Sequence, residues 1–269
     1  MLNFFIGLFF SSIIAIIAYK SNSLTFSGSL CAIFVGTLIY TFGGFYLSII
    51  MISFFVSSSL ITKFKKEIKN DFEKLYKKTS KRDYTQVLVN SLPAIIYSIL
   101  YFYSKNNMFL VAYGVFFAAA NSDTWASELG VLSSHDPINI FTLKKMQRGI
   151  SGGVTLTGLF FSFIGSFFIG IVFMIGYIII FKKFLVLEIV KMFLIITFGG
   201  FIGSFLDSLL GILFQSLYID SMGVYTEKEI SNGKKNKLIK GYAFFDNNMV
   251  NLLSTSFVSF LSVFVYNFL

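Results

Sequence analysis

The sequence has little charge, a single cysteine and a single histidine. Because Cys31 is alone, an internal disulfide and a metal site built on thiolates are excluded. Because His135 is also alone, neither a zinc site nor a histidine-based catalytic triad is expected. Charged residues make up only 13% of the chain and hydrophobic residues 55%, and the mean hydropathy is +0.77. This composition is typical of a polytopic membrane protein, and it overrules the one or two soluble domains that 269 residues would allow.

The net charge of +9 indicates how the chain is oriented in a membrane and does not indicate nucleic acid binding. Nucleic acid binding would require the basic residues to form one face of a soluble domain. Here all but four of the 22 Lys and Arg residues lie in polar segments between apolar runs, at 19–27, 63–84, 131–150 and 219–246. The positive-inside rule makes these segments cytosolic and places both termini on the non-cytosolic side. No nucleic acid partner is expected.

The apolar runs predict an all-α polytopic integral membrane protein that forms a single membrane domain over residues 1–269. About eight transmembrane helices are predicted, within a range of about seven to nine. The segment 24–40 is short and contains Ser27-Gly28-Ser29, so it is predicted to be a broken or re-entrant helix. The predicted spans are 2–18, 24–40, 43–62, 86–103, 108–129, 151–181, 187–218 and 247–269.

Two longer polar segments separate these spans. In 63–84, apolar residues between Phe64 and Leu75 recur at helical spacing among many basic residues, which predicts a basic amphipathic helix on the cytosolic surface. The segment 219–246 is predicted to be a cytosolic loop.

The stretch 121–130 is the first candidate functional site. It reads Asn-Ser-Asp-Thr-Trp-Ala-Ser-Glu-Leu-Gly and closes the apolar run that begins near Met108. Asp123 and Glu128 therefore lie at or near bilayer depth, where an ionisable group costs roughly 2.5–3.5 kcal/mol on insertion scales. Such groups persist mainly where they face a cavity, an ion or a partner, so both carboxylates are candidate catalytic residues.

The span 187–218 carries a third acid. Gly200, Ser204, Asp207, Gly211 and Gln215 are three to four residues apart, which places them on one helical face. Two interpretations are open. The face is a helix contact in which a neighbouring hydroxyl or amide satisfies Asp207, or it leaves space for a ligand beside the acid.

The span 151–181 shows a contrasting pattern. Gly158, Ser162, Ser166 and Gly170 repeat every four residues without any charge. This pattern predicts plain helix packing and no chemistry.

A glycine-rich segment, Arg148-Gly149-Ile150-Ser151-Gly152-Gly153, precedes that span. Glycines at a helix start leave backbone N–H groups free, and with the helix dipole and Arg148 they can hold a phosphate. Arg148, Gly149, Ser151, Gly152 and Gly153 are therefore candidate phosphate-binding residues, although the segment does not match the Walker pattern.

Two further span starts carry amides. Asp246 is predicted to be a helix N-cap, and Asn247 and Asn251 continue a polar face into the membrane one turn apart. Gln86 and Asn90 do the same at the start of the span 86–103. We expect all four amides to contribute to nucleotide or phosphate binding.

The predicted topology brings these groups to the cytosolic membrane face. Carboxylates, amides and a glycine-rich segment suit Mg²⁺ with a polyphosphate, because Mg²⁺ bridges one or two carboxylates to substrate phosphates. The apolar interior behind them suits a lipid tail. The residues therefore indicate phosphoryl transfer at a membrane face, while a transporter or ion-coupled carrier remains the alternative from another class.

The same residues resemble the transmembrane protein 19 family, which includes the plant phytyl-phosphate kinase. The resemblance extends from about 25 to 265. It rests on the stretch 121–130, Gly-Gly-Val-Thr at 152–155, Gly203-Ser-Phe-Leu-Asp-Ser-Leu-Leu-Gly211, Asp246-Asn-Asn-Met-Val-Asn251 and Arg82-Asp-Tyr-Thr-Gln-Val-Leu-Val-Asn90. The core of 121–130 also looks like that of CTP-dependent phytol and dolichol kinases and, more distantly, of CDP-diacylglycerol synthases.

The resemblance implies roles for the acids. Asp123, Asp207 and Asp246 would serve metal and nucleotide, with Glu128 in the same site. The chain departs from the family pattern at Pro137-Ile-Asn-Ile-Phe, where the family commonly reads Pro-Arg-Leu-Ile-Thr. It departs again at Met146-Gln-Arg-Gly-Ile150, where the family reads Val-Pro-x-Gly-Thr. A basic residue and a hydroxyl near the phosphate site are missing.

Together these observations predict a membrane-embedded, Mg²⁺-dependent lipid kinase. It would transfer a phosphoryl group from a nucleoside triphosphate, CTP or another, to a polyprenyl-type monophosphate. The alternatives are a lipid cytidylyltransferase and a non-enzymatic carrier or degenerate membrane scaffold. The expected partners are the lipid membrane, an isoprenoid phosphate and a nucleotide. In a eukaryotic cell we expect the endoplasmic reticulum or another intracellular membrane.

Overall fold

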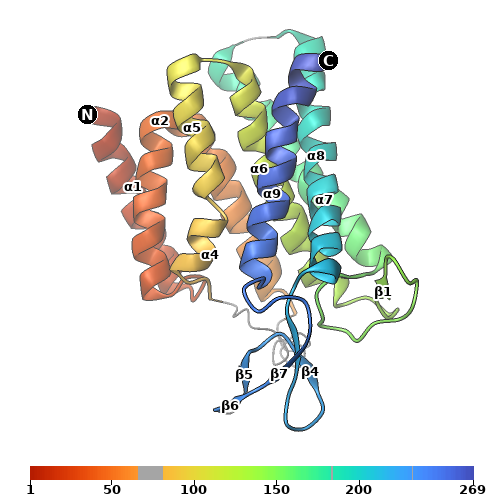
Figure 1. Ribbon diagram of the computed structural model, residues 1–269. Helices are drawn as coiled ribbons and strands as arrows, with labels where there is room; N and C mark the ends of the chain where they lie inside the picture. Colours follow the sequence, from red (N-terminus) through yellow and green to blue (C-terminus); the bar gives the residue numbers. More distant parts are fainter. Residues whose placement is uncertain (66–80, 183, 232) are drawn as a thin grey trace.

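A computed structural model describes residues 1–65, 81–182, 184–231 and 233–269. It shows a bundle of long helices with short β-strands beyond one end of the bundle (Figure 1). Within the described residues, 6 helical segments are long and apolar enough to cross a membrane. The all-α polytopic class is thereby confirmed. The helices are α1 (Leu2–Lys20), α2 (Phe26–Lys63), α4 (Tyr84–Val89), α5 (Leu92–Ser104), α6 (Asn107–Gly130), α7 (Leu156–Phe181), α8 (Val186–Leu213) and α9 (Asn247–Phe268).

Helix α2 contains two of the predicted spans, because the chain reverses inside it. Gly44 has φ 64° and ψ −160°, and nothing lies within 4 Å of the position that its Cβ would take. The two halves then pack on each other, as the approach of Gly36 to Met51 shows. With α6 as the fifth predicted span, every predicted span has a counterpart in the described structure.

The prediction of a broken or re-entrant helix over 24–40 is wrong. Thr25 caps α2 by accepting a hydrogen bond from the N–H of Gly28 at 3.1 Å, and the helix is continuous from there to the reversal at Gly44. Gly28 has another purpose, because a Cβ at this position would overlap the carbonyl oxygen of Arg82. The glycine permits close packing and does not break the helix.

Three other predicted boundaries are corrected. The span 86–103 is divided between α4 and α5, and Pro93 lies in the first turn of α5, where its missing N–H costs nothing. Helix α7 begins at Leu156 instead of Ser151, and α8 ends at Leu213 instead of Tyr218. The amphipathic helix predicted in 63–84 falls largely on residues 66–80, which lie outside the described residues.

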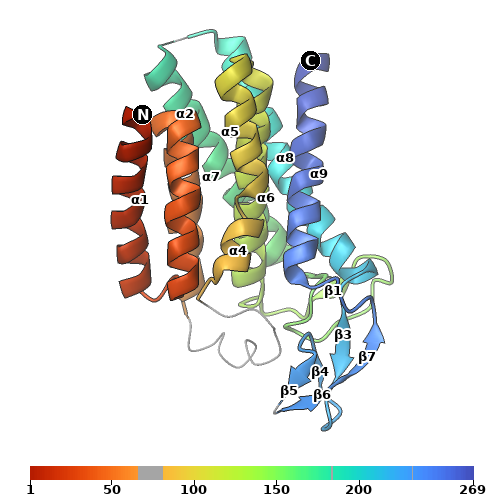
Figure 2. The same cartoon turned by 60° about the vertical axis from the view of Figure 1, so that its left-hand side comes forward.

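Helix α6 lies at the centre of the bundle, in contact with α2, α5, α7, α8 and α9 (Figure 2). Tyr113, Phe116 and Phe117 on α6 are fully buried, and the Tyr113 hydroxyl donates to the carbonyl of Leu47 at 2.7 Å. The glycine and serine stripe of α7 packs on α6 and α8, as predicted: Gly158 lies against Gly130, and Gly170 against Thr197.

Short antiparallel strands cover the end of the bundle opposite the two termini (Figure 1). β3 (Leu217–Ile219) pairs with β4 (Tyr225–Thr226) and with β7 (Lys237–Lys240). The other strand pairs are β1 (Ile138–Asn139) with β2 (Gly153–Val154) and β5 (Ile230–Ser231) with β6 (Lys234–Lys235). None of these strands was predicted. β1, β4, β5, β6 and β7 belong to two of the basic segments, whereas β2 and most of β3 fall in residues predicted as the ends of spans. The arrangement agrees with the predicted topology, and the assignment of sides stays a prediction.

Candidate functional site

The polar cavity, as we call it, has a volume of about 190 Å³ and opens at the end of the bundle where the basic segments lie. It is bounded by the start of α4, the end of α6, the start of α7, the second half of α8, the start of α9 and the segment 148–155. The predicted site residues that line it are Gln86, Asn90, Asp123, Glu128, Arg148, Gly149, Ser151, Gly152, Gly153, Asp207, Asn247 and Asn251. Asp246 is the one predicted site residue that does not line it.

The stretch 121–130 divides into a packing part and a cavity part. Asn121 is fully buried between helices, where its Nδ2 donates to the carbonyl of Gly165 at 2.8 Å and its Oδ1 accepts from Ser57 at 2.9 Å. Trp125 stacks on Phe168 at 5.9 Å and an interplanar angle of 22°, and it does not line the polar cavity. Only the other part of the stretch faces the cavity. Its members are Asp123, Thr124, Ala126, Ser127, Glu128 and Gly130.

Glu128 is fixed by a neighbouring helix. Its Oε1 accepts a hydrogen bond of 2.9 Å from the hydroxyl of Thr62 near the end of α2. Asp123 lies on the same helix five residues earlier, and both side chains are partly exposed toward the polar cavity. A carboxylate that is held by a hydroxyl and still lines a cavity is positioned for a cation or a donor ligand.

Asp207 takes part in a helix contact and also lines the polar cavity, as the two interpretations of its helical face described. Its Oδ2 accepts from the hydroxyl of Ser254 on α9 at 2.8 Å, and the amide of Asn251, oriented to satisfy its neighbours, donates to the same oxygen at 3.0 Å. Asp207 nevertheless lines the polar cavity with Ser204 and Ser208. Neighbouring groups therefore position the carboxylate without removing it from the cavity.

The glycine-rich segment does not open a helix, and that part of the prediction is wrong. Gly149 and Gly152 have φ of 86° and 87°, and α7 starts later, with Thr155 as its cap. A Cβ at Gly152 would overlap the Ile212 side chain, so the segment packs tightly on the last turn of α8. The segment still lines the polar cavity, held in position by its glycines and not by helix geometry.

A carboxylate already binds one N–H of this segment. The N–H of Ser151 donates to Oε1 of Glu227 at 2.9 Å, and Glu227 is only 6% exposed. The Ser151 hydroxyl in turn accepts from Nε2 of Gln215 at 3.0 Å. Because the Ser151 N–H already has this partner, phosphate binding by the segment would rest on other residues of the segment, and it stays a prediction.

Arg148 holds its own loop together. Its Nη1 donates to the carbonyl of Ser133 at 2.7 Å, its Nη2 to that of Ser134 at 3.1 Å, and its Nε to Oδ1 of Asp136 at 3.2 Å. The side chain lines the polar cavity, but three of its five N–H donors are used within the loop. Its main role in this structure is to position residues 133–148.

Arg82 is a site residue that the sequence prediction missed. It lines the polar cavity, donates from Nη2 to the hydroxyl of Ser58 at 2.8 Å and lies over the rings of Phe54 and Phe55 at 5.6 and 5.5 Å. Burial lowers the pKa of its guanidinium to about 10, and the charge of Glu128 opposes this shift. The side chain therefore remains a cation at neutral pH. Its position four residues before the predicted span 86–103 was the signal that could have revealed it.

The three acids predicted as metal ligands are not gathered into one centre. Within the described residues, no three His, Cys, Asp or Glu side chains form a group that could hold a metal ion. Asp246 instead caps α9, because its Oδ1 accepts from the N–H of Met249 at 3.1 Å. Asp123 and Asp207 both line the polar cavity, together with the amides of Asn247 and Asn251.

The fold and the polar cavity together define an integral membrane protein with several spans and a carboxylate-lined cavity at one end. The chain belongs to the family described as "Integral membrane protein DUF92", which matches residues 9–259. This membership confirms the family resemblance seen in the sequence.

Two relatives are similar over most of their length. The chain is 31% identical over 274 residues to "Protein PGR" of Arabidopsis thaliana, an alignment that covers 94% of this chain and 92% of that protein. It is 32% identical over 220 residues to "Uncharacterized membrane protein MJ0933" of Methanocaldococcus jannaschii, covering 80% of this chain and 84% of that protein. No solved structure matches the chain significantly.

Proposed function

We propose that the protein is a membrane-embedded lipid kinase that transfers the terminal phosphoryl group of a nucleoside triphosphate to a prenyl-type monophosphate. One observation carries this proposal. Acids, amides, a cation and a glycine-rich segment from five parts of the chain line a single cavity at one end of a membrane bundle. A carrier would instead be expected to hold its polar site near the midplane.

The donor set of the polar cavity fits Mg²⁺. Asp123 and Asp207 offer carboxylate oxygens, and Thr124 and the side chains of Asn247 and Asn251 offer further hard oxygens in the same cavity. Two carboxylates suffice, because Mg²⁺ is usually held by one or two of them together with substrate phosphates and water. When bound there, it would neutralise phosphate charge. Asp246 is left out of this set because it caps α9.

The reaction needs positioning more than acid–base chemistry. An oxygen of the prenyl monophosphate attacks the terminal phosphorus of the nucleotide, the bond from that phosphorus to the bridging oxygen breaks, and the nucleoside diphosphate leaves. The attacking phosphate is already ionised at neutral pH, so the lack of a histidine base is no obstacle. Arg82 and the segment 149–153 would orient the phosphates, while Thr62 and Ser254 hold Glu128 and Asp207.

A turnover assay tests the proposal. The purified protein in liposomes receives Mg²⁺, farnesyl phosphate and either labelled CTP or labelled ATP, and the lipid products are resolved by mass. Asp123→Asn and Asp207→Asn are compared with Asp220→Asn, whose carboxylate lies in an exposed turn outside the polar cavity. We expect farnesyl diphosphate from the native protein and from Asp220→Asn, and at least about a hundredfold less from the two cavity variants.

Each other outcome identifies an alternative. A nucleotidyl lipid with release of pyrophosphate would make the protein a cytidylyltransferase. No product with any nucleotide, from protein that unfolds cooperatively, would favour a carrier or a degenerate scaffold. Equal turnover in all three variants would overturn the assignment of the polar cavity as the active site.

A further inference from the structure

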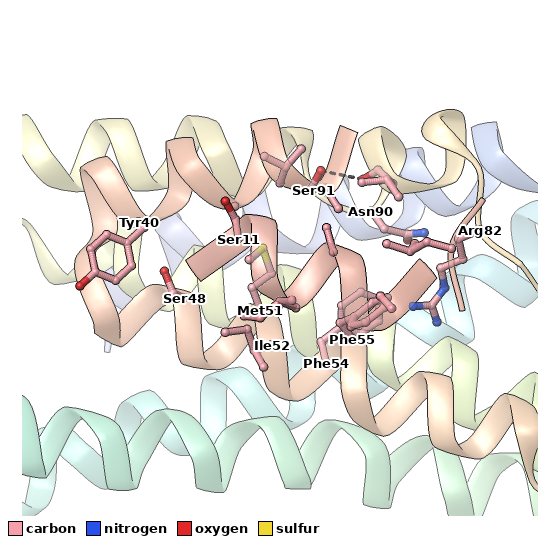
Figure 3. Close-up of a pocket in the computed structure, with 18 of the residues that line it drawn as sticks. Ser11, Tyr40, Ser48, Met51, Ile52, Phe54, Phe55, Arg82, Asn90 and Ser91 are labelled. Carbon is pink, nitrogen blue, oxygen red and sulfur yellow. Dashed lines mark hydrogen bonds between the residues drawn. The ribbon is translucent and has the colours of Figure 1, made fainter. Parts of the chain in front are cut away.

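A second cavity, which we call the apolar cavity, lies beside the polar cavity and has a volume of about 110 Å³ (Figure 3). It is lined by α1, both halves of α2, α4, the start of α5 and Phe117 on α6. Its walls are almost entirely aliphatic and aromatic, with Ile14, Ala15, Val35, Met51 and Phe55 among them. Such a surface accepts a hydrocarbon group and offers nothing to a nucleotide.

The two cavities meet at three polar side chains. Arg82, Gln86 and Asn90 line both of them. Figure 3 shows Arg82 and Asn90 at one end of the apolar cavity and Tyr40 and Ser48 at the other. The arrangement therefore has a hydrocarbon-lined part, a polar junction and a carboxylate-lined part in sequence, which matches the chemistry of an amphiphile with a phosphate head.

The junction contains buried polar atoms without a partner. Among the described residues, neither Nη1 of Arg82 nor Oε1 of Gln86 has a hydrogen-bond partner, and Gln86 is only 7% exposed. Leaving such a group buried and unsatisfied costs roughly 1–3 kcal/mol, so it marks a place where a ligand or water completes the bonding. The free donor on Arg82 suits a phosphate oxygen.

Close helix packing forms the outer wall of the apolar cavity. Helix α1 packs on α2 through small residues: a Cβ at Gly7 would lie 2.9 Å from Cβ of Tyr40, and one at Gly36 would lie 2.7 Å from Cβ of Ser11. The cavity between these helices has a volume of only about 110 Å³. A cavity of about 150 Å³ holds a benzene ring, so this slightly smaller one fits about one five-carbon isoprene unit.

We propose that the apolar cavity binds the first isoprene unit of a prenyl phosphate, with the phosphate at Arg82 and the remaining chain passing between helices toward the bilayer. The inference deepens the proposed function, on which the choice of a prenyl phosphate rests. A diacyl phospholipid would need room for two chains, which a cavity of about 110 Å³ does not provide. The ligand enters both cavities at once, and Arg82, Gln86 and Asn90 set the position of its head.

Photolabelling tests this without requiring turnover. A farnesyl phosphate analogue with a diazirine on its first isoprene unit is irradiated with the protein in liposomes, and the labelled peptides are identified by mass spectrometry. We expect labels on α1 and on both halves of α2, and competition by farnesyl phosphate but not by dioleoyl phosphatidic acid. Labels confined to other helices, or equal competition by phosphatidic acid, would overturn the inference.

Two variants of one helix supply the matched control. Ala15 is buried in the wall of the apolar cavity, whereas Ile16 is 53% exposed on the outer face of α1. Ala15→Phe fills the cavity and should lower labelling about tenfold, because the isoprene unit loses its apolar contacts, while Ile16→Phe should leave it unchanged. If Ala15→Phe does not fold, Ser48→Leu narrows the same cavity from α2. Unchanged labelling in a folded filled variant would contradict the proposal.

The assays separate the two proposals. Labels in the apolar cavity without turnover would support the binding site and contradict the proposed kinase activity. Turnover with labels on other parts of the protein would support the kinase activity and contradict this binding site.

Discussion

The hydroxyl of Ser254 on α9 lies 2.8 Å from Oδ2 of Asp207 on α8 and donates a hydrogen bond to it. Asp207 lines the polar cavity, and its position depends on a neighbouring helix. The helix contact and the ligand site, which the sequence left as alternatives, both use the carboxylate of Asp207. A ligand that binds Asp207 therefore also acts on the packing of α8 against α9.

Asp207→Asn should lower the rate of diphosphate formation more than Ser254→Ala does. Loss of the carboxylate removes a proposed ligand of the cation and should lower the rate of diphosphate formation at least about a hundredfold. Loss of the hydroxyl only frees the carboxylate to move, and such supporting partners typically matter about 10–100-fold. The rate and the thermal unfolding midpoint in detergent are measured for each variant, so that a loss of activity is distinguished from a loss of stability. Equal rates for Asp207→Asn and native protein would remove Asp207 from the site.

Asn121→Leu should affect stability and not chemistry. The substitution leaves the carbonyl of Gly165 and the hydroxyl of Ser57 without their buried partner, which costs roughly 1–3 kcal/mol. The same change at Asn267, an exposed residue in the last turn of α9, should leave the unfolding midpoint nearly unchanged. The activity per folded molecule should stay close to native in both. A selective loss of activity in folded Asn121→Leu would place this residue in the site.

Gly152→Ala should destabilise more than Gly223→Ala. Both glycines have positive φ, 87° and 80°, so each substitution costs about 1–2 kcal/mol in backbone strain. At Gly152 the new methyl group would also overlap Ile212 on α8, whereas nothing lies within 4 Å at Gly223. Overpacking adds about 1–3 kcal/mol at Gly152, so the unfolding midpoint should fall further for Gly152→Ala than for Gly223→Ala. Equal midpoints would mean that the segment 149–153 moves freely on α8.

Arg82→Gln should weaken phosphate binding in a pH-dependent way. Because the pKa of Arg82 is lowered to about 10, the native side chain carries its charge at pH 7–9 and loses it as the pH rises through about 10. Photolabelling by the farnesyl phosphate analogue should therefore be about tenfold stronger in the native protein at pH 8, with the difference narrowing above pH 10. Lys145→Gln serves as the matched control, because its side chain is 81% exposed and does not line either cavity. A difference that stays constant to pH 11 would contradict a role for the charge.

The pKa of Arg82 also has a consequence for stability. The pKa of Arg82 in the folded protein, about 10, lies below the ordinary value for arginine, so the unfolded chain binds this proton more tightly. The resulting penalty to the free energy of unfolding is fully present below pH 10 and declines as the pH rises above 10. Ser58 and the rings of Phe54 and Phe55 offset part of it through a hydrogen bond and cation–π contacts.

The sequence predicted the elements whose limits are local. Helix α9 begins at Asn247 because Asp246 caps it, and this cap was visible in the order of residues alone. Helix α6 begins and ends within one residue of its predicted span, because its apolar run is long and bounded by polar residues. Helical spacing and the positive-inside rule then placed most site residues at one membrane face, where the polar cavity lies.

The missed features depend on contacts between distant segments. Gly28 looks like a helix breaker, and only its approach to the carbonyl of Arg82, far along the chain, explains it. The glycines at 149–153 look like a helix start, yet they serve packing against Ile212. The sequence left two interpretations of Asp207 open, and only the structure shows that its carboxylate is held by Ser254 on α9 and still lines the polar cavity.

The enclosed position of α6 has a consequence for the membrane in which the protein works. Its neighbours on all sides are other helices, so hydrogen bonds such as that of Asn121 set its depth, and lipid contacts do not. A thicker or thinner bilayer acts first on outer helices such as α1, which respond by tilting. Asp123 and Glu128 therefore keep their height when acyl chain length changes, and the cavity they line is insensitive to hydrophobic mismatch.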